Sequence, residues 1–93
     1  MSSIQKEFVH APSAKLDYGF DWALWLQTGE HVVTSSWVVS SGLTPSSERL
    51  QDDVTSLFVE GGVVNSSYDL TNNIITSDGR KDSRTIKLLC KIR

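Results

Sequence analysis

The 93-residue sequence predicts an all-β domain made of two packed sheets. Apolar and polar side chains alternate with a period of two along several short runs, which is typical of half-buried strands. Turn-forming residues separate these runs, giving about seven strands at the spacing of a sandwich. Each strand has one apolar face, which a second sheet must cover. The length corresponds to one domain, and 39% hydrophobic with 22% charged residues argues against a disordered or membrane-spanning chain.

An extended arm is predicted at residues 1–13, followed by the sandwich domain at residues 14–93. The arm contains serine and proline breakers and few apolar anchors. Residues 6–9 could add an edge strand, and Pro12 would end it because proline cannot donate a ladder hydrogen bond.

The clearest period-two run covers residues 16–22. Its apolar face consists of Leu16, Tyr18, Phe20 and Trp22. Asp21 resembles a helix N-cap, and residues 22–26 have the composition of a single helical turn. That turn would carry Trp22, Trp25 and Leu26 over one end of the core.

Residues 31–39 are rich in β-branched side chains and predict the next strand. One face of it consists of Val33, Ser35, Trp37 and Val39, and Trp37 is the best candidate for the centre of the core. Loops are expected at residues 40–42 and 44–47, with Leu43 tucked in between them. Residues 48–53 are polar and predict at most a short edge strand.

Three further strands complete the pattern. They are expected at residues 54–59, at residues 68–76 and at about residues 83–92. Asp78-Gly79 predicts a hairpin turn between the last two. The inward-facing residues of these last two strands are Tyr68, Leu70, Asn72 and Ile74, then Ile86, Leu88, Cys90 and Ile92.

Two aromatic residues favour an immunoglobulin-like strand order in this antiparallel sandwich. Trp37 lies on the third strand. Tyr68 lies at the start of the penultimate strand, where a tyrosine corner would hold the preceding loop.

Cys90 is the single cysteine, so the chain has no intramolecular disulfide and no cysteine-based zinc cage. Its apolar surroundings predict a small buried hydrophobe on a strand. An intermolecular disulfide in an assembled particle is the alternative. The N-terminal residues contain no apolar segment of a secretory signal, so the protein is expected to be made in a cytoplasm and kept there or assembled from it.

The net charge of −2 is unevenly distributed. Residues 80–93 carry six basic side chains against Asp82, a charge of +5, whereas residues 1–79 carry three basic and ten acidic side chains, a charge of −7. Either the basic strand pairs with acidic neighbours on its sheet, or it forms a docking surface of one sign. Because the basic residues are not interleaved with aromatics, no nucleic acid partner is expected.

No constellation of side chains predicts catalysis, a metal site or a cofactor. Asp17 and Asp21 share a strand face and Asp52-Asp53 are adjacent, which is typical of solvated faces and edge protection. His10 and His31 lie far apart in sequence and have no partner at ligand spacing. We therefore predict a binding protein and not an enzyme.

Exposed aromatic and basic residues are the candidate partner contacts. Trp22 and Trp25 lie three residues apart around the predicted turn. Both could cap the core, or one could face outward, as tryptophans at protein interfaces do. The candidate contact residues are Phe8, Trp25, Arg80 and Arg84.

Several short blocks, taken in order, resemble a family of small immunoglobulin-like virion structural proteins of tailed bacteriophages. These blocks are Leu16-Asp17-Tyr18-Gly19-Phe20-Asp21-Trp22 with Trp25-Leu26, Thr34-Ser35-Ser36-Trp37-Val38-Val39 with Ser41-Gly42-Leu43, Glu60-Gly61-Gly62, Tyr68-x-Leu70-Thr71-Asn72-x-Ile74-x-Thr76, and Asp78-Gly79-Arg80-x-Asp82-x-Arg84. The resemblance covers about residues 15–92. It implies that the motif residues determine the fold, and with Tyr18 from the strand pattern the predicted fold determinants are Tyr18, Trp22, Trp37, Tyr68 and Asn72. The loop at Val63-Val64-Asn65 departs from the family pattern and is a candidate for a contact specific to this member.

The resemblance implies a non-enzymatic virion protein that binds the capsid surface or the neck, as a decoration, head-associated or adaptor subunit. Its expected partners are the major capsid or neck proteins, and repetition on the particle implies a symmetric homo-oligomer. One alternative is a module that recognises carbohydrate or protein on the host surface through Trp25 and the loops at 40–47 and 60–67. Another is a regulatory binding protein inside the infected cell. No membrane partner is expected.

Overall fold

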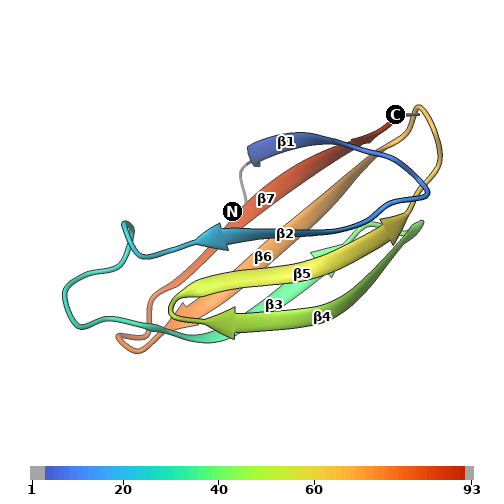
Figure 1. The fold of residues 1–93 in the computed structure, drawn as a ribbon. Helices are drawn as coiled ribbons and strands as arrows, with labels where there is room; N and C mark the ends of the chain where they lie inside the picture. Colours follow the sequence, from blue (N-terminus) through green and yellow to red (C-terminus); the bar gives the residue numbers. More distant parts are fainter. Residues whose placement is uncertain (1–3, 92–93) are drawn as a thin grey trace.

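The computed structural model describes residues 4–91, with side chains from residue 6 onward. Two sheets pack face to face in an elongated domain (Figure 1). The strands are β1 (Ile4–His10), β2 (Lys15–Asp21), β3 (Val32–Val39), β4 (Leu43–Gln51), β5 (Val54–Gly61), β6 (Ser67–Thr76) and β7 (Lys81–Cys90). The predicted all-β sandwich is confirmed. No helix within the described range is long and apolar enough to cross a membrane.

Strand pairing explains the order of the two sheets. The four-stranded sheet has the order β1-β7-β6-β3 and the three-stranded sheet the order β2-β5-β4. All neighbours are antiparallel except β1, which runs parallel to β7 from the Ile4–Thr85 pair to the His10–Cys90 pair. The antiparallel expectation therefore fails at this one pair. Residues 6–9 do lie in an edge strand, and that strand ends two residues before Pro12.

The core lies between the sheets and is formed by the alternating positions of the strands. Its buried apolar residues are Tyr18, Phe20, Trp22, Val32, Trp37, Leu43, Leu57, Val59, Tyr68, Leu70, Ile74, Ile86, Leu88 and Cys90. Trp22 is fully buried, whereas Trp37 keeps 9% of its surface and stacks on Phe20 with ring centroids 6.0 Å apart. Trp22, rather than Trp37, is thus the tryptophan that the core encloses completely. Burial of the Cys90 thiol raises its pKa, which agrees with a structural role.

A buried polar cluster around Asn72 joins the two sheets. The Trp22 indole N–H donates to Asn72 Oδ1 over 3.0 Å, and the Thr55 hydroxyl donates to the same oxygen over 2.6 Å. Asn72 Nδ2 donates to Ser35 Oγ and to the Ser36 carbonyl. Because both ends of the amide have partners, its burial costs little and it fixes the alignment of β3, β5 and β6.

Tyr68 forms the predicted tyrosine corner. Its hydroxyl accepts a 2.9 Å hydrogen bond from the Val63 backbone N–H, five residues upstream. The ring also packs against the turn at Gly42, where a Cβ atom would meet it at 2.9 Å. The corner therefore holds the β5–β6 loop and the β3–β4 turn together.

Three local expectations differ from the structure. Val33 is 56% exposed because a register shift between Val32 and Thr34 interrupts the alternation of β3. Residues 44–47 are not a loop but belong to β4, whose pairing shifts between Ser46 and Arg49. Leu16 is exposed at the start of β2. The predicted inward position of Ile92 lies outside the described residues.

Candidate functional site

The segment between β2 and β3 extends beyond one end of the sheets, beside the β4–β5 and β6–β7 turns (Figure 1). Backbone hydrogen bonds give it a defined shape. Trp25 and Leu26 both donate their N–H groups to the Trp22 carbonyl, which closes the predicted single turn. The Asp21 carboxylate accepts from the Ala23 N–H over 2.9 Å, as expected of a cap. We call residues 22–31 the tip segment.

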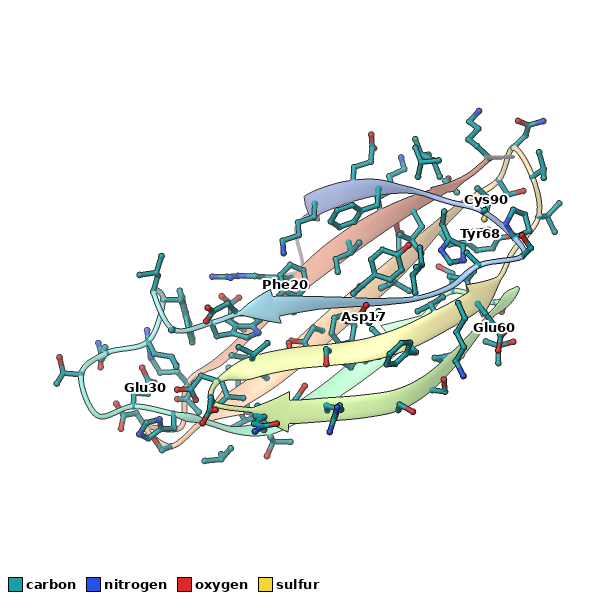
Figure 2. All side chains as sticks on the ribbon, in the orientation of Figure 1. Asp17, Phe20, Glu30, Glu60, Tyr68 and Cys90 are labelled. Carbon is teal, nitrogen blue, oxygen red and sulfur yellow. The ribbon has the colours of Figure 1, made fainter. Side chains whose placement is uncertain are left out.

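Glu30 fastens the tip segment to the β6–β7 hairpin (Figure 2). Its buried carboxylate accepts hydrogen bonds from Arg80 Nε over 2.8 Å, from Arg80 Nη2 and from the Thr76 hydroxyl. The Gln27 N–H also donates to it. This two-pronged pairing is the strongest arrangement that arginine and a carboxylate can form. The tip segment is thus held at both of its ends.

Trp25 completes the attachment. The Arg80 guanidinium lies 4.0 Å from the centroid of its ring and donates to its carbonyl. The Trp25 ring also meets the Trp22 ring edge-on, with centroids 5.4 Å apart. Trp25 is therefore a half-buried support of the tip segment and not a free platform.

The Glu30–Arg80 pair predicts a specific loss of stability in acid. Hydrogen bonds from Arg80 lower the pKa of the Glu30 carboxyl from 4.5 to about 2. Because the folded pKa lies below the unfolded one, the stabilisation is complete above about pH 4.5 and is lost as the pH falls toward 2. Thermal melts of the wild type and of Glu30→Gln should differ at pH 7 and converge near pH 2. The control is Asp17→Asn, which alters an exposed carboxylate. A melting difference between the wild type and Glu30→Gln that stays the same from pH 7 to pH 2 would contradict this assignment. So would an equal pH dependence for Asp17→Asn.

Leu24 lies in the single turn that opens the tip segment. It is fully exposed (103% relative to an extended reference) and is the most exposed large apolar side chain of residues 6–91. Isolated exposed leucines are common and need no explanation by themselves. This one is unusual because the turn that carries it is ordered by Glu30, Arg80 and Trp25. Because the backbone of this turn is already ordered, binding through Leu24 costs less entropy than binding through a flexible loop.

Arg84 adds an available positive charge at the same end. Its guanidinium lies 4.1 Å from the centroid of the Trp22 ring. Within residues 6–91 no carboxylate forms an ion pair with it. Two other basic residues nearby behave differently, because Arg80 of the β6–β7 hairpin pairs with Glu30, and Lys87 of β7 lies in register with Glu7 and Asp69. Two basic residues of this region thus have acidic neighbours, whereas Lys81 lies in register with Ile75 and Arg84 with Asn72, so each of the two sequence interpretations holds for part of the region.

The opposite end of the domain presents a second ordered loop, formed by residues 62–66. The Asn65 N–H donates to the Cys90 carbonyl, and the Cys90 N–H donates to the Ser66 carbonyl. Val63 is held by Tyr68, yet its side chain remains 62% exposed. Figure 2 shows Tyr68 and Cys90 at the end away from Glu30. The two ordered loops thus lie at opposite ends of a molecule 43 Å long.

Comparison with known families identifies the chain. Residues 10–89 match the family described as the podophage GP4 fiber-tail adaptor protein gp77. The chain belongs to this family. A comparison with curated proteins gives no match. Family membership makes the chain a structural protein of the phage virion, as the sequence blocks predicted.

Within this adaptor family member, three of the four predicted contact residues lie together. Trp25, Arg80 and Arg84 meet at the tip end, whereas Phe8 lies on β1 and packs against Tyr18 with ring centroids 5.5 Å apart. The five predicted fold determinants are all buried. The alternative recognition surface is not continuous, because Trp25 lies at the end opposite the β3–β4 and β5–β6 loops.

Sequence reasoning missed Glu30, Leu24 and the burial of His10. Glu30 follows a Thr-Gly turn, and nothing nearby in sequence indicates that its partner is fifty residues away. Leu24 looks like a core residue of the helical turn. His10 is enclosed beside Tyr18, with 2.8 Å between Nδ1 and the hydroxyl, and burial lowers its pKa. No group of three or more potential metal ligands occurs within the described range.

Proposed function

We propose that this protein is an adaptor that joins a tail fibre to the phage tail by holding one neighbour at each end of its sandwich. The observation that carries the proposal is the pair of ordered loops at opposite ends, each with an exposed apolar residue, Leu24 or Val63. The printed description of the matching family supports the fibre–tail assignment. The scaffold is inferred to be immunoglobulin-like, supported by the tyrosine corner and by the strand order.

Leu24 and Val63 suit this role because interface energy concentrates in a few well-packed side chains. The fully exposed Leu24 can enter an apolar pocket of a partner, and the stacked Arg84 can meet an acidic group on its rim. Electrostatic complementarity of this kind adds specificity more than affinity. Val63 offers a smaller apolar contact at the other end.

The test uses phage particles made with Leu24→Asp or Val63→Asp, followed by quantitative mass spectrometry of the adaptor, fibre and tail proteins. One variant should yield particles that keep the adaptor but lose the fibre, and the other should yield particles that lack both. The control is Ser47→Asp, which adds the same charge halfway along β4, where the left-handed backbone tolerates aspartate. All three variants must melt like the wild type.

Copy number separates this proposal from a capsid-decoration or neck role. Adaptor copies that follow the number of fibre attachment points on tail fractions would support the fibre–tail assignment. If the protein is found on heads, in a number proportional to that of the major capsid protein, the fibre–tail assignment is wrong and the protein is a capsid decoration. Wild-type levels of adaptor and fibre in both variants would show that the end loops are not the contacts.

A further inference from the structure

The free edge of β3 differs from the other three sheet edges. Exposed strand edges are normally protected by charges, proline or bulges, because they otherwise pair with other chains. The edge strands β1 and β2 carry several charged side chains, and β4 carries Pro45, a register shift and the Glu48-Arg49 pair. By contrast, residues 32–47 contain no charged side chain. The only irregularity of β3 is the register shift near its first residue.

The pairing with β6 shows which backbone groups β3 offers to a partner. Hydrogen-bonded and non-hydrogen-bonded pairs alternate along an antiparallel ladder. The Ser40 N–H donates to the Asp69 carbonyl, so even-numbered residues of this register face β6. The odd residues Ser35, Trp37 and Val39 therefore direct their N–H and C=O groups to the free edge.

A shallow hollow of about 330 Å³ lies beside this edge, between β3 and β4. Its walls are formed by residues 33–35 on one side and residues 48–50 on the other. Val33 and Leu50 contribute partly exposed apolar surface to it. The edge thus offers unpaired backbone groups next to a hollow of mixed character, in which Val33 and Leu50 lie beside the charged Glu48 and Arg49. Free backbone groups and an adjacent recess for side chains are the two components of strand-addition sites.

We propose that this edge binds the β3 edge of a second copy of the chain, in antiparallel orientation around a two-fold axis. The charge pattern selects this occupant. Self-pairing of an uncharged strand places no like charges opposite each other, whereas a two-fold pairing of β1, β2 or β4 would bring charged side chains into the new ladder. A two-fold contact also requires a single self-complementary patch, and the uncharged Val, Thr and Ser side chains of β3 provide one.

The alternation of the ladder fixes the register. Because the odd residues of β3 direct their backbone groups to the free edge, odd residues of one copy must pair with odd residues of the other. All of residues 33–39 find a partner in the second copy only when Ser36 lies on the two-fold axis. Ser35 of each copy then opposes Trp37 of the other in a hydrogen-bonded pair. The two Ser36 residues form a non-hydrogen-bonded pair, with Cα atoms about 4.5 Å apart. Two four-stranded sheets would become one continuous sheet.

This contact uses the side of the domain and leaves both end loops free, so it goes beyond the adaptor role and does not depend on it. A seven-residue strand pair is about 23 Å long and is small beside the ~1,200 Å² of a stable interface. We therefore expect a weak dimer in solution, with a dissociation constant between about 1 μM and 1 mM. Many copies side by side on a particle would reinforce such a contact.

Cysteine cross-linking tests the register directly. Ser36→Cys should form a disulfide-linked dimer under mild oxidation at least ten times faster than Ser67→Cys, an exposed control on β6. The background is low because the native Cys90 is fully buried. Equal rates for the two variants would overturn the proposed register.

A charge variant and sedimentation complete the test. Ser36→Lys places two cations on the axis and should raise the dissociation constant at least tenfold, while Ser67→Lys should leave it unchanged. Melting curves verify that both variants fold.

A wild type that stays monomeric up to about 1 mM, or a dimer whose dissociation constant does not change in Ser36→Lys, would overturn the proposal. Cross-linking of Ser36→Cys to a different virion protein, with no self-cross-link, would assign the edge to that partner. Leu24→Asp and Val63→Asp should dimerise like the wild type, which separates this outcome from failure of the adaptor role.

Discussion

Replacing Trp22 with alanine is expected to destabilise the domain by about 3–5 kcal/mol, the usual cost of removing a buried aromatic ring. Trp22 has no exposed surface and donates to Asn72 in the cluster that joins the sheets. Its ring also contacts Trp25 and supports the Arg84 guanidinium. The variant therefore loses packing on both sides of the ring as well as a buried hydrogen bond. Small domains have a total stability of about 5–15 kcal/mol, so a large part of it depends on this residue.

Urea denaturation measures this loss. With a slope of about 1 kcal/mol per molar urea for a small domain, the midpoint of Trp22→Ala should fall by about 3 M or more. The matched control is Leu24→Ala, two residues away and fully exposed, which should change stability by less than about 0.5 kcal/mol. A Trp22→Ala midpoint within the range of the control would mean that the enclosed position of this ring is wrong.

Gly62→Ala is expected to be comparably costly, at about 2–6 kcal/mol, the sum of a backbone cost and an overpacking cost. The φ angle of Gly62 is +103°, a conformation that side chains other than glycine adopt at a cost of about 1–3 kcal/mol. The new Cβ would also overlap Cys90 Sγ and press on Leu43 and Tyr68, each at 3.3 Å. Overpacking of this kind costs a further 1–3 kcal/mol or so.

Two variants separate the backbone cost from the overlap. Gly29→Ala has a positive φ of +79° and no atom within 4 Å of the new Cβ, so it reports the backbone cost alone. Cys90→Ala removes the sulfur atom, so Gly62→Ala should cost less in that background than in the wild type. Equal costs of Gly62→Ala in the two backgrounds would show that the loop moves away from Cys90 instead of pressing on it. Chemical denaturation of the wild type, the three single variants and the double variant of Gly62→Ala and Cys90→Ala gives the comparison.

Much of this fold could be predicted from the sequence because its signals are local. The alternation of Tyr68, Leu70, Asn72 and Ile74, the Asp78-Gly79 turn and the buried Cys90 all follow from short patterns. The tyrosine corner was predictable because its two partners are five residues apart. The alternation of apolar and polar side chains predicts the buried face reliably wherever a strand is regular and one of its faces is buried.

The errors arose where a register shift breaks the alternation. One extra residue between Val32 and Thr34 moves Val33 from the core to the surface. A similar shift near Ser47 lets β4 continue through residues that looked like a loop, because its left-handed φ of 53° absorbs the bend. The parallel pairing of β1 with β7 could not be predicted from local sequence patterns either, because it joins residues near the two ends of the chain.

The candidate site was harder to predict than the fold. Trp25, Arg80 and Arg84 were singled out by residue type alone, and the structure brings them together. The residue that organises them is Glu30, whose contacts with Arg80 and Thr76 span about fifty positions of sequence. Such long-range pairs leave no periodic signal in a single sequence.

The placement of the two loops at opposite ends has a mechanical consequence. The strands run along the length of the domain, from the tip segment toward the loop at residues 62–66 (Figure 1). Tension between neighbours attached at the two ends would therefore act parallel to the strands. Under such a load the hydrogen bonds of each ladder are sheared together, instead of being peeled apart one after another. A connector loaded in this direction yields only when many bonds fail at once, so the orientation of the sandwich suits it to transmit force without unfolding.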